Sequence, residues 1–343
     1  METVYVDGRA GEGGGQILRT SLTLACITGK SLHIENVRAA RRNPGLARQH
    51  LSCVRAAAEI CGAQCQGASL SSQVLEFQPR HIRGGDFTFD IGSAGSASLV
   101  VQTVLPALFV AGESSTVTVT GGTHNPWAPP FDFLAETFLP AVASAGFAAD
   151  CRLIRHGFFP AGGGKVALDV QPWRRSPGRT LNLCVSGGER LIHARIYTAR
   201  LPGHIARRQE KLLLQSRLKF ENIEHIEVTD SDGPGNCVML RLSDSLRTTV
   251  LTAFGQRGKP SEKVVGEVVR LAESFLRSEA AVDRFLADQL LIYMALLESG
   301  CYTTNELSAH LTTNIETIKK FLPIDFTIEQ QGQLYRISAV RCA

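Results

Sequence analysis

One rhythm recurs along this chain of 343 residues: a β-rich run ends in glycine, and an apolar helical pattern follows it. The predicted pairs are residues 4–15 with a helix at 16–28, 43–45 with a helix ending near 61–62, 87–91 with 99–109, and 116–120 with 131–145. Strands that alternate with helical runs predict an α/β or α+β layer architecture built from repeated βαβ-like units.

The texture of the chain changes near residue 173, where residues 173–179 form a polar connector that contains proline and glycine. A self-contained set of strand-like and helical runs follows, with helices predicted at about 205–219 and 261–277, which suits a small inserted domain. Beyond it the first pattern returns, with helices predicted at 285–297 and 315–321. The predicted division is 1–182 for the first part of a large domain, 183–278 for the inserted small domain and 279–343 for the C-terminal part of the large domain.

Composition excludes several classes of protein. With 44% hydrophobic and 20% charged residues the chain has ample core, and no apolar run reaches the about 20 residues that a membrane-spanning helix needs. The first residues show no basic-then-apolar signal, and the nine cysteines form no Cys-x-x-Cys pair, so neither a disulfide framework nor a zinc site is indicated. We therefore expect a cytoplasmic protein without a membrane partner.

Residues 8–19 read Gly-Arg-Ala-Gly-Glu-Gly-Gly-Gly-Gln-Ile-Leu-Arg and connect a predicted strand to a predicted helix. Backbone amides and the helix dipole can hold an anion at such a turn. The loop lacks the Gly-Lys-Ser/Thr of a P-loop, and instead carries Glu12 among glycines and Arg19 later. A carboxylate beside a phosphate site implies a divalent cation between them. For this loop taken alone, a tight turn with a solvated glutamate is the favoured interpretation.

Arginines crowd a second segment, with Arg38, Arg41, Arg42, Arg48 and Arg55 preceding the next acidic residue. Guanidinium forks match phosphate oxygens, so the segment fits a phosphate clamp; the commoner explanation is a solvated basic face. The net charge of +4 is too small to indicate nucleic-acid binding by itself.

Three histidines stand out by their neighbours. His50 closes the arginine-rich segment, and His156 opens a second glycine cluster that ends at Lys165. His310 lies in Leu-Ser-Ala-His-Leu-Thr-Thr-Asn, residues 307–314, where apolar and polar residues alternate; a strand here would point its polar groups one way. Thr313 with the glutamate three residues later makes a capping box for the following helix. A lone histidine at a strand end is more often structural than catalytic, so spacing alone favours a structural role for His310.

Two other segments have the composition of a nucleotide site. Residues 92–105 form a small-residue loop that runs into a helix, which allows close approach of a phosphate or tight packing. Residues 285–289 place an aromatic residue beside an acid and an amide, which suits a purine or, equally, a helix start packed on the core.

Taken together, these segments closely resemble the RNA 3′-terminal phosphate cyclases, over essentially the whole chain. The matching segments are 7–19, 34–38, 43–50, 91–96, 102–106, 121–123, 128–130, the signature at 156–164, 287–290, and His310 with 313–314. Each is weak alone, but their shared order and spacing make the match specific. The resemblance implies a large domain of repeated βαβαββ units, related to the fold of EPSP synthase and the C-terminal domain of initiation factor 3, with an inserted thioredoxin-like domain that lacks redox cysteines.

The resemblance also implies a reaction. Cyclases of this family convert an RNA 3′-phosphate to a 2′,3′-cyclic phosphate with ATP, through a covalent histidine–AMP and an RNA-pp-A end, and release AMP and pyrophosphate. The implied cofactors are ATP and Mg²⁺ or Mn²⁺, and the implied partner is RNA with a 3′-phosphate end. A monomer and a homodimer stay open.

The family's functional residues carry over by position. His310 matches the adenylated histidine and Glu12 the metal-binding glutamate. The residues that match the ATP-binding segments are Gln102, Pro129 (against the adenine), Phe285, Leu286, Ala287, Asp288 and Gln289. The residues that match those around the phosphates and the RNA end are Arg19, Arg38, Arg41, Gln49 and His50.

The chain departs from the family pattern at a few positions. Phe285 stands where bacterial relatives carry tyrosine, which keeps stacking and loses a hydroxyl, and His124 and Trp127 replace acidic and small residues, with any effect expected on substrate contacts. Two other functions compete with the cyclase: a non-enzymatic ribosome-biogenesis relative, and a carboxyvinyl transferase suggested by fold analogy alone. The first lacks the nucleophilic histidine and the second needs neither that histidine nor ATP, so His310 with Glu12 argues against both.

Overall fold

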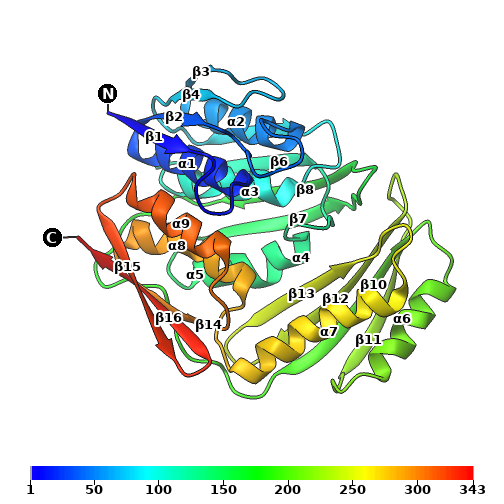
Figure 1. The fold of residues 1–343 in the computed structure, drawn as a ribbon. Coiled ribbons are helices and arrows are strands. Elements are labelled where there is room, and N and C mark those ends of the chain that lie inside the picture. Colours follow the sequence, from blue (N-terminus) through cyan, green and yellow to red (C-terminus); the bar gives the residue numbers. More distant parts are fainter. Residues whose placement is uncertain (1, 343) are drawn as a thin grey trace.

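The computed structural model describes residues 2–342, and across these residues the strands form four sheets of four strands each. Three of the sheets have one topology: in each, a βαβαββ unit places its strands in the order first, second, fourth, third. The first two strands of every unit are parallel, and the other pairings are antiparallel. Figure 1 shows the three units gathered on one side of the molecule. The predicted α/β class with repeated βαβαββ units is confirmed.

The bounds of the elements follow the predicted rhythm closely. The first unit is β1 (Thr3–Asp7), α1 (Gly15–Thr28), β2 (Ser31–Glu35), α2 (Arg48–Cys61), β3 (Gln64–Gln66) and β4 (Leu75–Gln78). The second is β5 (Gly85–Asp90), α3 (Ala97–Phe109), β6 (Ser115–Gly121), the helical run α4 (Phe131–Phe133), η1 (Leu134–Phe138) and α5 (Leu139–Ala143), then β7 (Ala149–Arg155) and β8 (Gly164–Val170). The third is β9 (Asn182–Leu183), α8 (Arg284–Leu297), β14 (Cys301–Thr304), α9 (Ala309–Lys319), β15 (Ile324–Gln331) and β16 (Leu334–Arg341).

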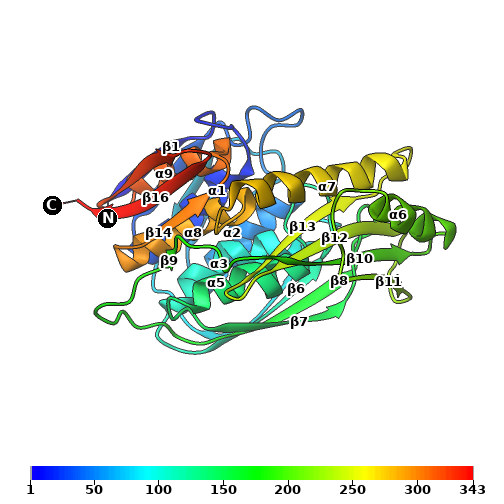
Figure 2. The same ribbon diagram turned by 90° about the horizontal axis from the view of Figure 1, so that it is seen from below.

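The third unit is interrupted between its first strand and its first helix. The intervening elements are β10 (Leu191–Ala199), α6 (His204–Leu214), β11 (Asn222–Val228), β12 (Gly235–Ser243), β13 (Thr248–Phe254) and α7 (Ser261–Ser278). Their sheet has the order β11-β10-β12-β13, and α6 and α7 lie on one face of it (Figures 1 and 2). Val238, Leu251 and Phe275 belong to a separate hydrophobic cluster between this sheet and its helices. The layer has the expected thioredoxin-like topology; the domain boundaries at 182/183 and 278/279 stay a prediction.

Local sequence explains the common core. Val4 and Val6 alternate with exposed residues on β1, while Leu18 and Leu22 recur at helical spacing on α1, and all four are buried in one cluster that extends through the three units. Helix α1 ends at Gly29, which adopts φ 69° and so supplies the left-handed turn that a side chain would resist.

One prediction of secondary structure is wrong, and it concerns His310. Residues 307–312 do not form a strand: Ser308 caps α9 by accepting the Leu311 amide at 3.1 Å, and His310 stands in the first turn of that helix. The buried Leu311, Ile315 and Ile318 repeat with helical rather than alternating spacing. The predicted capping box at residue 313 is likewise wrong, because the helix has already begun there.

Among residues 2–342, no helix is long and apolar enough to cross a bilayer. The predicted cytoplasmic location stays a prediction.

Candidate active site

A cavity of about 1260 Å³ lies where the three units meet the inserted layer, and residues at the start of each unit's helices line it together with residues of β13 and α7. The helix starts that reach the cavity contribute Gly15 and Gln16 of α1, Arg48 and Gln49 of α2, Ala47 before it, Ser96 before α3, Pro130 before α4, Arg284 and Phe285 of α8, and Ser308 and His310 around the start of α9. Helix N-termini carry partial positive charge and free amides, so the arrangement favours an anionic ligand.

The glycine loop approaches this cavity so closely that side chains have no room. A Cβ on Gly15 would run into the His50 ring, and one on Gly14 would collide with the carboxylate of Glu12 and the guanidinium of Arg41. The loop is tied to the far end of the chain, because the Glu12 amide donates to Thr313 Oγ1 at 3.2 Å. Because these glycines carry no side chain, the loop can lie directly against His50, Glu12 and Arg41.

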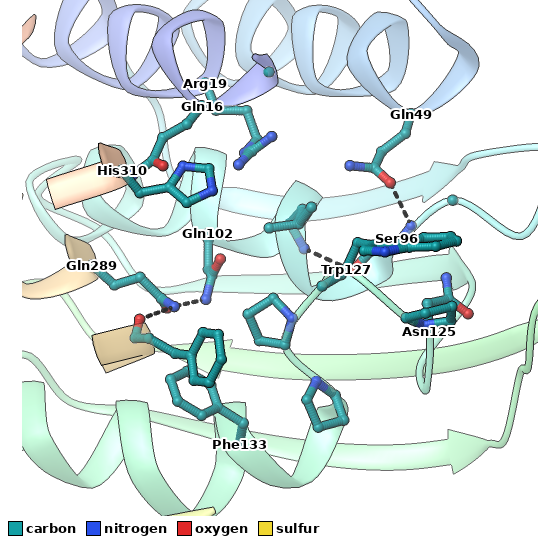
Figure 3. A pocket seen from close by; sticks show the side chains of 18 of the residues that line it. Gln16, Arg19, Gln49, Ser96, Gln102, Asn125, Trp127, Phe133, Gln289 and His310 are labelled. Carbon is teal, nitrogen blue, oxygen red and sulfur yellow. Dashed lines mark hydrogen bonds between the residues drawn. The ribbon is translucent and has the colours of Figure 1, made fainter. Parts of the chain in front are cut away.

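His310 faces the cavity (Figure 3), and Glu12 lines the same cavity. Its Nδ1 lies 3.3 Å from Glu12 Oε1, and the His310 side chain is 44% exposed against 12% for Glu12. Neither atom has an aligned hydrogen-bond partner among the described residues. Burial is the main cause that lowers the pKa of His310; the charges of Arg19, Arg41 and Arg284 add to it, and Glu12 opposes it. The imidazole is therefore neutral near pH 7, which is the form that can act as a nucleophile.

The predicted phosphate-binding residues meet at this cavity, and Arg41 and Arg38 have partners within the chain. Arg41 pairs with Glu12 Oε2 at 2.9 Å, while Arg38 donates to the carbonyls of Asn43 and Gly45 within its own loop. Burial first, and then the neighbouring arginines, lower the pKa of His50 to about 3 and keep it neutral.

Arg19 and Gln49 reach the same cavity from α1 and α2. Arg19 is half-buried, and Gln49 Oε1 accepts the Ser96 amide at 2.8 Å, which joins the first unit to the second (Figure 3). With His50, Arg38 and Arg41 they bring every residue predicted to surround the phosphates to one cavity.

The predicted nucleotide-binding residues lie along another wall of the cavity. Gln102 donates to Gln289, whose own amide donates to the Phe285 carbonyl at 2.7 Å (Figure 3). Phe285 is 40% exposed, and Pro129 lines the same space. Two apolar surfaces and two amide groups are the means by which proteins bind a planar base.

Two residues of the predicted nucleotide set are not brought to the cavity. Leu286 and Ala287 are buried in the common core, and the Ala287 carbonyl accepts from the Tyr302 hydroxyl at 2.6 Å. Their helical neighbours Phe285, Asp288 and Gln289 face the cavity instead, as the period of 3.6 residues requires.

Sequence reasoning missed Gln16, which donates to Asp288 Oδ2 at 3.1 Å and so joins α1 to α8. Burial raises the pKa of Asp288 to about 7. Sequence reasoning also missed Asn314, whose side chain accepts a hydrogen bond from the Thr20 hydroxyl at 2.5 Å and donates one to the Asp288 carbonyl at 2.7 Å. Gln16 follows the glycine loop directly, which was a usable signal; the partners of Asn314 are far apart in sequence and left none.

The described residues contain no group of three or more His, Cys, Asp or Glu side chains that could hold a metal ion by themselves. Glu12 nonetheless fits a cation that binds chiefly to phosphates, because its Oε1 is buried without a hydrogen bond and faces the cavity. Mg²⁺ is commonly held by one or two carboxylates together with substrate phosphates and water.

The second glycine cluster contacts the inserted layer, and its Phe159 and Pro160 line the cavity. His156 packs beside the buried His124, with ring centroids 5.3 Å apart, and Arg155 pairs with Asp232 at 2.5 Å. Among the described residues His156 does not line the cavity, so any role of His156 in the chemistry differs from that of His310.

Known proteins resemble the chain over its length. A family model of the RNA 3′-terminal phosphate cyclases matches residues 10–328. The chain is 47% identical over 328 residues to an RNA 3′-terminal phosphate cyclase of Ralstonia nicotianae, covering 96% of this chain and 94% of the relative. It is 45% identical over 338 residues to that of Salmonella enteritidis, covering 98% of each, and 43% identical over 343 residues to that of Pseudomonas fluorescens, covering 100% and 98%. On this evidence the chain belongs to the RNA 3′-terminal phosphate cyclase family.

Proposed function

We propose that this protein converts an RNA 3′-phosphate to a 2′,3′-cyclic phosphate at the expense of ATP, with His310 as the nucleophile. The observation that carries the proposal is the neutral imidazole of His310, half-exposed in a cavity that also holds five candidate phosphate-binding residues and an unpaired carboxylate oxygen of Glu12.

In the first step Nε2 of His310 attacks the α-phosphorus of ATP. A nitrogen–phosphorus bond forms, the bond from the α-phosphorus to the bridging oxygen breaks, and pyrophosphate leaves. Glu12, 3.3 Å from Nδ1, orients the ring by attracting the Nδ1 proton, which leaves the Nε2 lone pair directed to the cavity. The adenine lies between Phe285 and Pro129, with Gln102 and Gln289 at its edge.

In the second step an oxygen of the RNA 3′-phosphate attacks the same phosphorus, and the bond to His310 breaks. The vicinal 2′-hydroxyl then attacks the RNA phosphorus, AMP leaves and the hydroxyl proton passes to solvent. The last step is intramolecular, so alignment supplies much of its rate. Arg19, Arg38 and Arg41 stabilise the charge that these phosphates carry.

A divalent cation, Mg²⁺ or Mn²⁺, would be held by Glu12 and would neutralise phosphate charge there. The fit rests on the unpaired Oε1 of Glu12. Arg41 occupies the other carboxylate oxygen at 2.9 Å, so Glu12 contributes a single oxygen ligand.

The decisive experiment incubates the pure protein with α-³²P-ATP and Mg²⁺, followed by denaturing electrophoresis. We expect an adduct that is labile to acid and stable to alkali, and that disappears in His310→Ala. His81→Ala, which removes an exposed histidine outside the cavity, is the matched control and keeps the adduct.

Conversion of a 3′-phosphorylated RNA to its phosphatase-resistant cyclic form then tests the full reaction. A folded His310→Ala protein that still forms the adduct refutes the assignment of the nucleophile. A folded wild-type protein that forms none supports the competing function, a relative that keeps the fold without the chemistry.

A further inference from the structure

One aromatic pair at the cavity is unusually exposed. Trp127 is 84% exposed and Phe159 is 53% exposed, and both line the cavity that holds His310. Their rings meet edge to face, with centroids 6.5 Å apart and planes at 76°. Large aromatic side chains that remain exposed beside a binding cavity are typical of surfaces that bind another flat ring.

The backbone holds Trp127 in this position against its own preference. Trp127 has φ 65°, in the left-handed region that a bulky side chain seldom adopts. The segment around it is stiffened by Pro126, Pro129 and Pro130, and the amide of Phe131 closes the loop by donating to the Thr123 carbonyl at 2.9 Å. Strain of this kind persists where the surrounding structure imposes it, often at ligand-binding sites.

Phe159 is fixed by the same framework. The neighbouring Phe158 is buried, so its successor is turned outward. The loop that carries Phe159 is joined to the Trp127 loop, because the amides of Thr123 and His124 donate to the Gly157 carbonyl at 2.8 and 3.1 Å. The two rings therefore form one preorganised surface.

A small-residue loop joins this aromatic surface to the basic wall of the cavity. Asn125 donates to the Ala94 carbonyl, and Arg48 donates to the Gly92 carbonyl at 3.3 Å, so both are anchored on residues 92–96 (Figure 3 shows Asn125 beside Trp127). Asn125 lies two residues before Trp127, so the aromatic loop and the Arg48 guanidinium contact one segment. Proteins bind single-stranded nucleic acid with such neighbours: the base stacks on the ring, and the guanidinium neutralises the backbone phosphate.

We propose that Trp127 and Phe159 stack a base of the RNA strand close to its 3′ end and thereby align the terminal phosphate with His310. The proposal rests on the proposed cyclase function and extends it to a named subsite for the RNA substrate. The proposed adenine site uses Phe285, Gln289 and Pro129, and Pro129 lies on the same loop as Trp127, so the experiment has to separate RNA binding from ATP binding at this loop.

The test measures binding of a fluorescein-labelled single-stranded RNA with a 3′-phosphate, by anisotropy and without ATP. Stacking on an aromatic ring implies that Trp127→Ala weakens binding about 5- to 150-fold, while Trp127→Phe restores most of it. An RNA whose last nucleotides lack bases binds wild type and Trp127→Ala equally. Tyr5→Ala, which removes another exposed aromatic residue outside the cavity, leaves binding unchanged.

Labelling with α-³²P-ATP is measured in parallel and does not change in Trp127→Ala. A variant that loses ATP labelling but binds RNA normally overturns the proposal, because adenine is then the occupant; so does unchanged RNA binding. Failure of the proposed function is distinguishable: wild type then yields no adduct, while RNA binding still depends on Trp127. Quenching of tryptophan fluorescence is a second readout, because the other tryptophan, Trp173, is packed against Phe147.

Discussion

Asp132 joins the three-unit core to the inserted layer through a buried charge. Its Oδ2 lies 2.8 Å from His124 Nε2, and its Oδ1 accepts the Tyr197 hydroxyl at 2.8 Å, with Arg195 at 3.4 Å. Asp132 lies on α4 and Tyr197 on β10, and both are buried. We expect Asp132→Asn to destabilise the protein, because the amide cannot replace the charge that these partners surround.

The pKa of Asp132 gives the size of the expected loss in the free energy of unfolding. Burial alone would raise it, but the hydrogen bond and charge of His124, with Tyr197 and Arg195, lower it from 3.8 to about 2. At 1.36 kcal/mol per unit, the charged form contributes about 2 kcal/mol to the free energy of unfolding at pH 7. The more severe Asp132→Ala leaves buried partners without a hydrogen bond and costs about 3–5 kcal/mol.

Urea unfolding at pH 7, followed by circular dichroism, measures the loss, with the exposed Asp86→Asn as the matched control. Because the folded pKa is depressed, the contribution is complete above about pH 4 and is lost as pH falls toward 2. The difference between wild type and Asp132→Asn must therefore shrink below pH 4. A loss smaller than about 0.5 kcal/mol at pH 7, or a difference that does not change with pH, refutes the reasoning.

Three further outcomes are expected at the active site. Gly15→Ala forces a Cβ into the His50 ring, so we expect it to abolish adduct formation. Gly29→Ala is the control: its Cβ meets open space, but its positive φ is strained, so it lowers stability and leaves the chemistry intact. Labelling and thermal unfolding separate the two effects. Glu12→Gln should raise the Mg²⁺ concentration needed for half-maximal labelling, and an unchanged metal titration contradicts its assigned role. The lowered pKa of His310 predicts that labelling declines, as pH falls, at a lower pH than an ordinary histidine would give, and a pH series of labelling rates measures this.

Much of this site was predictable, because its parts are local. Glycines around Glu12, arginines spaced along residues 38–48 and the aromatic, acidic and amide residues of 285–289 each indicate a binding loop before any contact is known. Their meeting in one cavity was inferred from family resemblance, and the cavity places them together. No pattern in the segments themselves relates positions as far apart as Glu12 and Thr313.

The errors have equally local causes. Alternation over residues 307–312 is too short to separate a strand from the first turn of a helix, and Ser308 decides it by capping Leu311. Leu286 and Ala287 were carried over with their segment; their side chains lie in the core because one face of α8 alone reaches the cavity, and their part in a nucleotide site stays a prediction. The contacts of Asp132 with Arg195 and Tyr197 were invisible because these two partners belong to a β-strand more than sixty positions away, as the separation of 65 between Asp132 and Tyr197 shows.

The repeated topology explains how a chain with a net charge of only +4 can hold phosphates. Each unit turns the starts of its helices toward the same cavity, so partial charges of about +0.5 at the helix ends add to the arginines there. The positive potential is confined to the cavity, so the net charge of the chain does not reveal it. It also bears on His310, since a position in the first turn of α9 disfavours the imidazolium and keeps the ring in its nucleophilic form. In the proposed mechanism, the helix ends that attract the phosphates therefore also keep the imidazole ready to attack one of them.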